Sequence, residues 1–355
     1  MGSTRHILHI VGARPNFVKV APVLRALKEY DLRQTLIHTG QHYDANMSDV
    51  FFTQLEIPAP DINLEVGSGS HASQTAEIMR RLEPVISDRR PDLVLVYGDV
   101  NSTLAAALVC SKLLVPVAHV EAGLRSFDRT MPEEINRVVT DCLSDMLFTP
   151  SEDADANLQR EGVSNARIHL VGNVMIDSLI RLLPQARECA IDNLPERFAL
   201  VTLHRPANVD NSENLLSIMR CIIEACGELD IVFPVHPRTR QRLSQLESDS
   251  RLHLLEPVPY VQFLSLQTHG GVVITDSGGI QEETTYLGIP CLTLRESTER
   301  PITISLGTNT LIGNDMNRLR LEMQKILGGS GKKGVIPPLW DGETGRRIAR
   351  IIAQS

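Results

Sequence analysis

Three acidic side chains in the first half of the chain, Asp99, Glu121 and Glu133, stand at or soon after the ends of predicted strands. Carboxylates that converge on one side of a site raise one another's pKa toward neutrality, so such groups could give and take protons. Each also has a simpler interpretation. Asp99 could cap the next helix, Glu121 could orient a loop, and Glu133 could favour a helix dipole and pair with Arg137. Taken singly the simpler interpretations prevail, but the shared location favours a site.

A second group of residues could bind a phosphate. The stretch Val272–Glu283 has the pattern of a buried strand, a turn at Ser277-Gly278-Gly279 and a helix start. Such a turn aims backbone N–H groups and the positive end of a helix dipole at one point, which suits an anion. Glu283, in the first turns of this helix, could accept a hydrogen bond from a ribose. Alternatively, the two glycines form an ordinary turn and Ser277 only caps the helix.

Cations and histidines follow other predicted strands. Arg14 and Lys19 flank the first strand-to-helix turn and offer two cations to a diphosphate. As solvated residues of a helix start they would need no ligand. His204 and His236 end strands of the second half, where a histidine can donate to a phosphate or shuttle protons. Each could instead be a loop histidine bonded to the backbone; the pattern favours a site for His204 and is neutral for His236.

These residues are positioned by strands that alternate with helices along the whole chain. The pattern predicts the α/β class, with a parallel sheet in each half and ligands at the carboxyl ends of the strands. An internal echo between 98–102 and 275–279 suggests two doubly wound domains that face each other across a cleft. Strands are expected at Ile7–Val11, Gln34–Thr39, Leu93–Tyr97, Val115–Val120, Met146–Thr149, Ile168–Val171, Phe198–Leu203, Ile231–Val235, Leu252–Leu255, from Val272, and at Pro290–Leu294.

One predicted helix is clearly amphipathic. Its apolar positions recur at helical spacing, which normally marks the face turned to the core; they are Ile135, Val138, Val139, Cys142 and Leu143. A charged, proline-containing region follows later, and we expect the domain boundary near residues 172–196.

Composition excludes several classes of function. The 355 residues include 35 Lys and Arg against 43 Asp and Glu, which argues against a broad nucleic-acid surface. No apolar run reaches membrane-spanning length, and no leader segment is evident. The six cysteines show no metal-type spacing and indicate buried, reduced thiols in a cytoplasmic protein. No Gly-x-Gly-x-x-Gly follows the first strand, so hydride transfer is disfavoured. We expect neither a metal nor a cofactor.

Taken together, the motifs resemble the UDP-N-acetylglucosamine 2-epimerases, in particular the non-hydrolysing type. Each motif is weak alone, but together they run in order through almost the whole chain. They are Gly-Ala-Arg-Pro at 12–15 with Lys19, Gly-Asp at 98–99, Val-Glu-Ala-Gly-Leu-Arg at 120–125, Pro-Glu-Glu-Ile-Asn-Arg at 132–137, His-Arg-Pro at 204–206, Asp-Ser-Gly-Gly-Ile-Gln-Glu-Glu at 276–283 and Thr-Glu-Arg-Pro at 298–301.

The resemblance implies the glycosyltransferase-B architecture, with two Rossmann-like domains at 1–172 and 173–341 and a C-terminal helix at 342–355 that returns to the first domain. It also implies a homodimer that interconverts UDP-GlcNAc and UDP-ManNAc in the cytoplasm and supplies UDP-ManNAc for cell-surface polysaccharide. The family's route removes the C2 proton, expels UDP to leave a 2-acetamidoglucal, and adds UDP back. Departure of UDP must then be stabilised by cations and helix dipoles.

The resemblance also assigns roles by motif. Asp99, Glu121 and Glu133 match the family's catalytic acids, and His204 matches its catalytic histidine. The positions that match UDP-binding residues are Arg14, Lys19, Ser277, Gly278, Gly279 and Glu283, with Glu283 on the ribose. Phe263 looks like the residue beside the uracil, and Arg137 and His236 look like further contributors to the pocket.

The chain departs from the family at two places. Asn16 stands where the family often has Glu, and the run Gln41-His42-Tyr43-Asp44 lacks a final glutamine that helps several bacterial members bind an activating substrate molecule. Allosteric activation is therefore expected to be weak or absent. Four alternatives stay open: a hydrolysing epimerase that releases ManNAc, a 2-epimerase of a modified UDP-N-acetyl sugar, a glycosyltransferase of the same fold, and a nucleotide-sugar-binding regulator.

Overall fold

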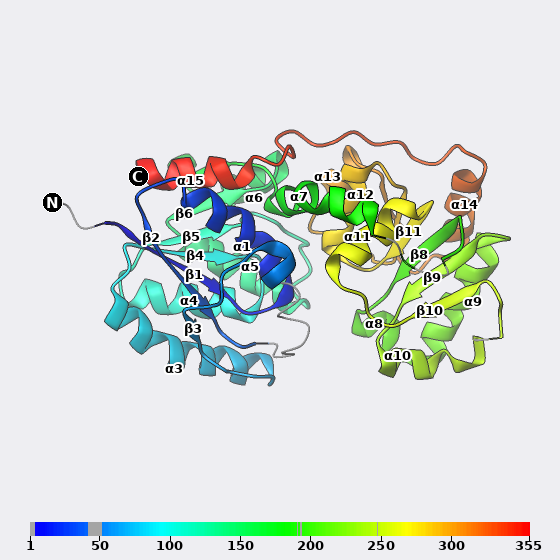
Figure 1. Ribbon diagram of the computed structural model, residues 1–355, viewed down its shortest axis with the longest axis horizontal. Coiled ribbons are helices and arrows are strands. Elements are labelled where there is room, and N and C mark those ends of the chain that lie inside the picture. Colours follow the sequence, from blue (N-terminus) through cyan, green and yellow to red (C-terminus); the bar gives the residue numbers. More distant parts are fainter. Residues whose placement is uncertain (1–3, 42–51, 190, 192–193, 247) are drawn as a thin grey trace. The chain divides into compact units, whose positions relative to one another are not determined.

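The computed structural model describes residues 4–41, 52–189, 191, 194–246 and 248–355, and contains two parallel sheets with helices between their strands (Figure 1). The predicted α/β class is thereby confirmed. The chain divides into two compact units: unit 1 comprises residues 1–178 and 338–355, and unit 2 comprises residues 179–337. The division falls inside helix α7 (Val174–Glu188), where the sequence suggested a boundary between 172 and 173.

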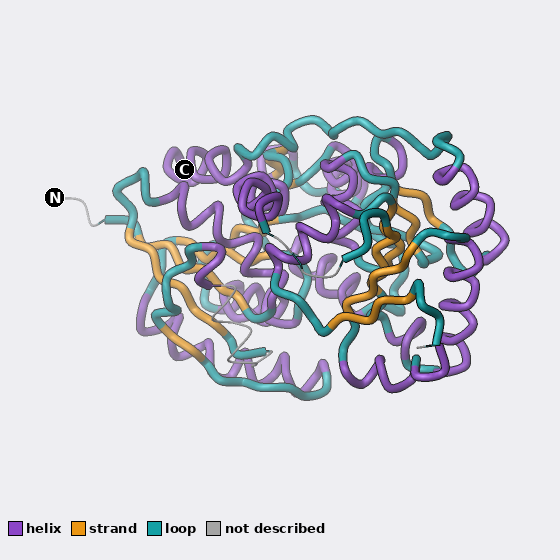
Figure 2. Tube along the Cα trace, turned by 45° about the vertical axis from the view of Figure 1, so that its right-hand side comes forward, coloured by secondary structure: helices purple, strands orange, loops and turns teal. Residues whose placement is uncertain are grey.

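Unit 1 is built on a seven-stranded sheet in the order β3-β2-β1-β4-β5-β6-β7, and every pairing is parallel. The order reverses between β1 and β4, which is the point where ligands bind in doubly wound sheets. Helices cover both faces of the sheet (Figure 2). The strands are β1 His6–Val11, β2 Arg33–His38, β3 Ile62–Asn63, β4 Leu93–Tyr97, β5 Val117–Val120, β6 Met146–Thr149 and β7 Ile168–Leu170; the helices are α1 Arg14–Leu27, α3 His71–Arg89, α4 Asn101–Lys112, α5 Pro132–Leu143 and α6 Glu152–Arg160.

Unit 2 repeats this plan with six parallel strands in the order β10-β9-β8-β11-β12-β13. Its order reverses between β8 and β11, the counterparts of β1 and β4. The strands are β8 Phe198–Thr202, β9 Asp230–Pro234, β10 Leu252–Leu255, β11 Val272–Thr275, β12 Cys291–Thr293 and β13 Asn309–Leu311; the helices are α8 Pro206–Val209, α9 Ser212–Cys226, α10 Pro237–Arg242, α11 Tyr260–His269, α12 Gly278–Leu287, α13 Ile302–Ser305 and α14 Met316–Leu327.

The central strands form because their residues are β-branched or apolar and lie between two layers of helix. All five residues of β4 are buried, as are all four of β11. Continuous apolar runs of this kind are typical of parallel strands covered on both faces. The short edge strands β3 and β13 were not predicted, because a strand of two or three residues is too short to show a recognisable hydrophobic pattern.

The last helix, α15 (Thr344–Gln354), packs against α1 within unit 1. Its apolar stripe is fully buried at Ile348 and Ile352. The carboxylate of Asp177 accepts hydrogen bonds from the backbone N–H groups of Thr344 and Gly345, at 3.2 and 2.7 Å, and so satisfies the first turn. Asp177 lies at the start of α7, so this cap ties α15 to the last residues before the division between units.

Helix α5 is turned the opposite way from the sequence expectation. The helix itself is present, but its polar residues Glu134, Arg137 and Asp141 are buried, whereas Ile135 and Val138 are 45% and 38% exposed. An apolar stripe normally faces the core, so expecting that stripe to be buried was wrong for the most exposed positions. The buried polar face carries residues that the strand-end turns need, as described below.

The cysteines are only partly buried, which corrects a second expectation. All six are free thiols; Cys110, Cys226 and Cys291 are buried, but Cys142 is exposed on the outer face of α5. Burial raises the pKa of the Cys110 and Cys226 thiols to about 12. In the described ranges, no helix combines the length and the apolar character that a membrane span requires.

Candidate functional site

The turns after β1, β4 and β5 meet at the place where the strand order of unit 1 reverses, and they carry the predicted acids and cations. Arg14 begins α1, directly after the turn that follows β1. Asp99 follows β4, and Glu121 is the first residue after β5. The rule that ligands bind beyond the carboxyl ends of parallel strands therefore applies to these residues together.

Lys19 and Glu121 form a buried ion pair, a link that the sequence did not reveal. Each residue is 5% exposed, and Lys19 Nζ contacts Glu121 Oε2. Glu121 has a φ of +74°, a conformation that non-glycine residues adopt rarely and that often marks a functional position. The predicted phosphate ligand and the predicted acid are thus two halves of one charged unit.

Gly98 leaves the space that this ion pair occupies. Its φ is +63°, and a Cβ at this position would lie 2.5 Å from Lys19 Nζ and 3.3 Å from Glu121 Oε2. A Cβ essentially never lies closer than 3.0 Å to a non-bonded atom, so any side chain at position 98 would displace Lys19 Nζ and disturb the ion pair.

We expect Gly98→Ala to lower the free energy of unfolding by more than the roughly 1–2 kcal/mol that the left-handed conformation costs a non-glycine residue. Gly67→Ala is the matched control, because Gly67 has a φ of +77° and no atom within 4 Å of the added Cβ. Denaturant titration of both variants separates the backbone cost from the displacement of Lys19. Equal losses would contradict the assigned role of Gly98.

Asp99 is held by Arg137 from the buried face of α5. The guanidinium contacts Asp99 Oδ2 through Nη1 and Glu134 Oε2 through Nη2, the latter at 2.6 Å. Asp99 does not cap α4, whose N-cap is Val100, and Asn136 Nδ2 donates to the Asp99 carbonyl at 2.8 Å. Arg137 therefore contacts a predicted catalytic acid directly.

The expected pairing of Glu133 with Arg137 is replaced by the pairing of Glu134. Glu133 is half-buried in the first turn of α5 and makes no hydrogen bond or ion pair within the described ranges. Glu134 also accepts from the N–H groups of Ser126 and Phe127, both at 2.9 Å. Burial raises the pKa of Glu134, but Ser126 and Arg137 outweigh it and hold the pKa below its ordinary value. The signal for Glu134 was its spacing of three residues from Arg137.

The turn after β1 is closed by Asn16, one of the two departures from the family pattern. Asn16 Oδ1 accepts from the N–H groups of Gly12 and Ala13 at 2.9 and 3.0 Å, and its Nδ2 donates to the Tyr97 carbonyl at 2.8 Å. This single amide joins the ends of β1 and β4, a task that needs one acceptor and one donor. Of the second departure, Gln41 is described and His42, Tyr43 and Asp44 lie outside the described residues.

His204 and Asp276 form a pair at the strand reversal of unit 2. His204 Nδ1 lies 2.9 Å from Asp276 Oδ1, while the imidazole is 62% exposed. Asp276 is fully buried and also accepts from the Arg205 N–H and from Asn208 Nδ2, both at 2.9 Å. Burial raises the pKa of Asp276, but His204 and these donors outweigh it, so the pKa is lowered. A carboxylate on Nδ1 orients the ring and leaves Nε2 for a ligand.

Asp276 is a candidate functional residue that the sequence pointed to only as part of a motif. Its signal was its place at the end of β11, next to β8, which ends two residues before His204. The sequence showed both strand ends but gave no indication that the two strands are neighbours.

Ser277, Gly278 and Gly279 form the start of α12, as expected. Ser277 occupies the N-cap position but its side chain makes no capping hydrogen bond, so the simpler interpretation of this serine is wrong. The first N–H groups of the helix and its positive dipole end remain available for an anion. A Cβ on Gly278 would lie 2.5 Å from both Arg300 Nη1 and Glu299 Oε1.

Arg300 adds a cation beside this helix start that was not among the predicted site residues. It is 6% exposed, its Nε lies 3.0 Å from Glu282 Oε1, and it contacts Glu299. Arg295 pairs with the other oxygen of Glu299 at 2.6 Å. The Thr-Glu-Arg-Pro motif was the available signal, but its neighbour Glu282 became evident only in the fold.

Glu283 lies on α12, and its side chain is buried against α11. Its two carboxylate oxygens accept from Tyr260 Oη at 2.8 Å and from Gln267 Nε2 at 2.5 Å. Burial raises the pKa of Glu283, and these two donors only partly offset it. An ionised carboxylate has about four lone-pair directions, so two bonds leave capacity for a ribose hydroxyl. Phe263, also on α11, is half-buried against the apolar cluster that includes Phe198 and Leu266.

His236 is exposed at the N-cap of the short helix α10. Its Nδ1 accepts from the Arg238 N–H at 3.3 Å, so the ring caps the helix through one nitrogen. The sequence analysis left a ligand role and a local backbone bond equally open for this residue, and the structure adds the local bond.

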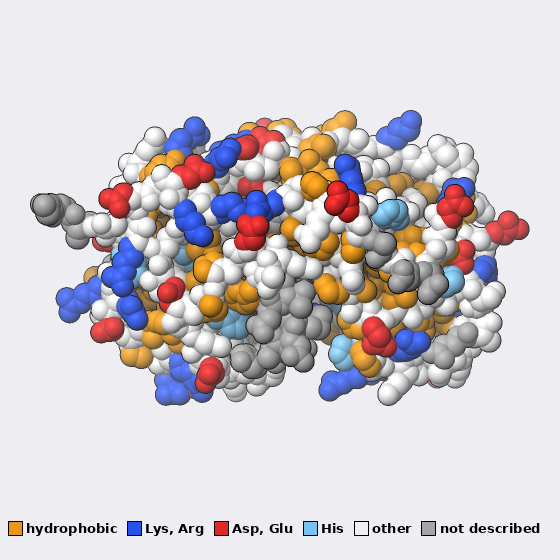
Figure 3. Space-filling model, viewed as in Figure 1, with side chains coloured by type: hydrophobic (Ala, Val, Ile, Leu, Met, Phe, Trp, Pro, Cys, Tyr) orange, Lys and Arg blue, Asp and Glu red, His pale blue; other side chains and the backbone are white. Residues whose placement is uncertain are grey.

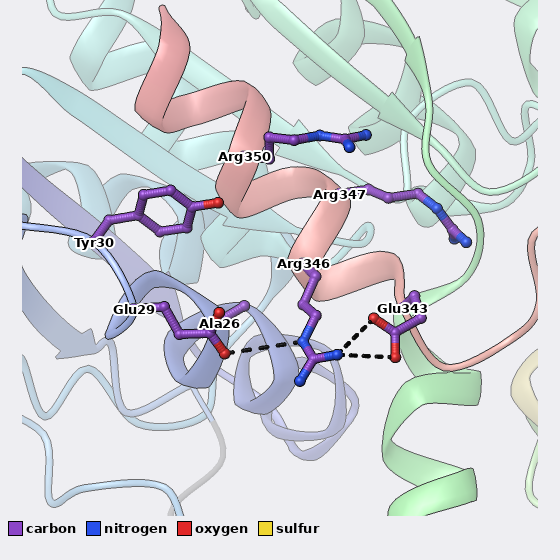
Figure 4. Close-up of a pocket in the computed structure, with 7 residues that line it drawn as sticks. All are labelled: Ala26, Glu29, Tyr30, Glu343, Arg346, Arg347 and Arg350. Atoms are coloured by element: carbon purple, nitrogen blue, oxygen red, sulfur yellow. Dashed lines mark hydrogen bonds and ion pairs between the residues drawn. The ribbon is translucent and has the colours of Figure 1, made fainter.

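The surface depression drawn in Figure 4 contains none of the predicted site residues. It has a volume of about 340 Å³ and lies between α1 and α15, with Tyr30, Arg346 and Arg350 in its wall. Arg346 is neutralised by Glu343 at 3.0 Å and Glu29 at 3.9 Å. Basic and acidic side chains are interspersed on the face shown in Figure 3. Among the described residues, no group of His, Cys, Asp and Glu is arranged to hold a metal ion.

Comparisons with known proteins agree on one family. A family model described as UDP-N-acetylglucosamine 2-epimerase matches residues 25–353. The UDP-N-acetylglucosamine 2-epimerase of Methanocaldococcus jannaschii is 43% identical over 97% of each chain. The UDP-2,3-diacetamido-2,3-dideoxy-D-glucuronate 2-epimerase of Pseudomonas aeruginosa is 42% identical over 98% of this chain and 99% of its own. A crystal structure of the Methanocaldococcus enzyme in complex with UDP-GlcNAc and UDP superposes with a TM-score of 0.91 and 42% identity, covering 99% of this chain and all of that one.

Proposed function

Because the chain belongs to the UDP-N-acetylglucosamine 2-epimerase family, we propose that it interconverts UDP-GlcNAc and UDP-ManNAc without hydrolysis. The observation that supports this most directly is the pair of charged units at the strand ends of unit 1. Lys19–Glu121 and Arg137–Asp99 each join a buried cation to a carboxylate. Epimerisation through elimination needs acid–base groups and cations together, since a proton and the UDP diphosphate must leave the same sugar.

In the proposed reaction a carboxylate takes the proton from C2 while the bond between C1 and the diphosphate oxygen breaks. The electron pair of the C2–H bond forms the C1=C2 double bond of a 2-acetamidoglucal, and UDP leaves as the anion. Readdition of UDP to C1 with protonation of C2 on the other face completes the change. Asp99, Glu121 and Glu133 are the proposed acids and bases, in which role a positioned group contributes about 10²–10⁴-fold to the rate.

UDP must stay bound between the two steps. In unit 2 we assign diphosphate binding to the start of α12 at Ser277, Gly278 and Gly279, where N–H groups and the helix dipole favour an anion. In unit 1 we assign the same role to Arg14 and Lys19. His204, oriented through Nδ1 by Asp276, would donate to the diphosphate from Nε2 when both ring nitrogens carry a proton. We further assign the ribose to Glu283 and the uracil to Phe263, and we propose Arg137 and His236 as contributors to the pocket.

A modified sugar is the second candidate substrate. The Pseudomonas relative, named for a UDP-diacetamido-glucuronate, is nearly as similar as the Methanocaldococcus enzyme. That sugar differs by an acetamido group at C3 and a carboxylate at C6, so its enzyme has to accommodate a further anion. Comparing kcat/KM for UDP-GlcNAc with that for the diacetamido-glucuronate distinguishes the two candidates.

Incubation with UDP-GlcNAc in D2O tests the proposed function. We expect deuterium at C2 of both UDP-ManNAc and recovered UDP-GlcNAc, detected by NMR and mass spectrometry. Free ManNAc with stoichiometric UDP would indicate a hydrolysing epimerase. Unlabelled sugar without epimer would contradict the proposal and leave a glycosyltransferase or a binding protein.

We also propose a homodimer through the outward face of α5. Ile135, Val138 and Cys142 lie on one side of that helix and are all exposed. We expect Ile135→Glu with Val138→Lys to convert a dimer into a monomer, as measured by light scattering after size exclusion. The matched control is Leu321→Glu on α14, another exposed apolar residue of a helix, which is 57% exposed. A monomeric wild-type protein would contradict the proposal. The cytoplasmic location stays a prediction.

A further inference from the structure

His119 is a buried residue of β5 that the proposed reaction does not use. Its ring is fully inaccessible and lies between two oxygen atoms. Nδ1 is 2.6 Å from Asp141 Oδ1 on α5, and Nε2 is 2.8 Å from the carbonyl oxygen of Gly98, the residue before Asp99. No pattern in the sequence singled out His119 or Asp141.

Both partners of the ring can only accept hydrogen bonds in this arrangement. A backbone carbonyl has no proton to give, and the Arg125 guanidinium on the other Asp141 oxygen, at 2.7 Å, favours the ionised form of that carboxyl. A neutral imidazole would point one lone pair at an acceptor. The geometry therefore requires a proton on each nitrogen of His119 and a positive charge on the ring.

A neighbouring histidine shows the opposite case. His9, on β1, is equally buried, but its partners are the Tyr97 hydroxyl at 2.7 Å and Gln34 Oε1 at 3.2 Å. The hydroxyl can donate, so one nitrogen can stay unprotonated. Burial lowers the pKa of His9 to about 3. Two buried strand histidines of one sheet thus differ in charge because of what faces them.

Asp141 links the His119 ring to a second turn. Its other oxygen accepts from the Gly123 N–H at 3.0 Å and from Arg125 Nη1 at 2.7 Å. Gly123 follows Glu121 by two residues, and Arg125 is paired in turn with Glu161 at 2.7 Å. The charges that face His119 are therefore Asp141 on α5, then Arg125 and Glu161 beyond it, and the cluster is neutral only when the ring is positive.

We propose that His119 is a positioning residue, an imidazolium that fixes the Gly98–Asp99 peptide and, through Asp141, the turn that carries Glu121. The inference rests on the proposed function only in that these two acids do the chemistry. A shift of one ångström in a reacting group can cost about 10²-fold in rate. Hydrogen bonds that fix the position of such a group therefore affect kcat more than substrate affinity.

The charge is tested without any assay of activity. In protein labelled with ¹⁵N-histidine, long-range ¹H–¹⁵N correlation at pH 7 should show both nitrogens of His119 protonated and His9 as a neutral ring. His119→Gln and His9→Gln assign the two signals by their loss. A neutral His119 ring at pH 7 would overturn the inference, even if the enzyme epimerises UDP-GlcNAc as proposed.

The positioning role is tested by the same two variants, because they make one substitution at two buried strand histidines. We expect His119→Gln to lower kcat by about 10²-fold with KM and UDP affinity within about threefold, and His9→Gln to keep kcat within about threefold of wild type. Equal losses of kcat in the two variants would mean that His119 only packs in the core and has no positioning role. If His119→Gln does not fold, Asp141→Asn weakens the same hydrogen-bonded contact by changing the partner of the ring. An unchanged kcat in Asp141→Asn would overturn the proposal.

Discussion

Asp99→Asn should lower kcat for epimerisation by about 10²–10⁴-fold and leave UDP affinity within about threefold, since general acid–base catalysis contributes that much to a rate. The substitution preserves shape and removes the negative charge and, with it, the ability to carry a proton. Asp99 is 24% exposed, so its carboxylate can be reached, and Asn136 fixes its backbone carbonyl. The measurement is initial rate against UDP-GlcNAc, together with calorimetric titration of UDP.

The fold should tolerate this change because Arg137 keeps its second partner. Glu134 contacts the guanidinium through Nη2 at 2.6 Å and through Nε at 3.1 Å, so the buried cation stays neutralised. Asp341→Asn is the matched control, since Asp341 is also paired with an arginine, Arg347, but follows no strand. If both variants lose turnover equally, or if Asp99→Asn loses UDP binding as strongly as turnover, Asp99 is not a catalytic acid.

Glu121→Gln should lower the free energy of unfolding by about 3–5 kcal/mol, because it leaves a buried ammonium without its counter-charge. Lys19 is 5% exposed and its Nζ contacts Glu121 Oε2. Turnover should fall as well, so a single variant cannot separate catalysis from stability. Chemical denaturation at fixed pH measures the first effect and initial rates measure the second.

The double variant Lys19→Met with Glu121→Gln separates the two effects. Methionine fills a similar volume without a charge, so we expect much of the stability lost in Glu121→Gln to return, with a coupling energy of about 0.5–3 kcal/mol in the double-mutant cycle. Turnover should stay at the level of the worse single variant. Additive losses of stability would mean that the pair is not coupled, and recovered turnover would exclude Glu121 as a catalytic acid.

The sequence was sufficient to predict the strands whose carboxyl ends carry the candidate site residues, because two simple signals agree. Apolar runs such as Leu93–Tyr97 mark strands buried on both faces, and polar residues collect directly after them. Once the strands are parallel, those residues meet at one edge of the sheet. The order β2-β1-β4, which makes Gly98 a neighbour of the turn after β1, was not predicted and became evident only in the fold.

The partners of the site residues could not be predicted, because they depend on contacts between distant segments. Lys19 and Glu121 were assigned separate roles, and only the fold places their charges together. The same holds for Asp276 behind His204. The orientation of helix α5 was not predicted for a different reason. A period of 3.6 residues identifies a polar and an apolar face, but not which of the two faces is buried. Here Arg137 and Asp141 are buried because strand-end turns require their charges.

The packing of α15 on α1 has a consequence for synthesis on the ribosome. Unit 2 is one continuous stretch, 179–337, whereas unit 1 lacks its last helix until residues 338–355 have been made. The surface of α1 that α15 covers is therefore exposed while the whole of unit 2 leaves the ribosome. The Asp177 carboxylate that caps α15 lacks its partners during the same period. Nascent chains stalled after residue 337 should therefore present a foldable unit 2 together with a unit 1 that still lacks residues 338–355.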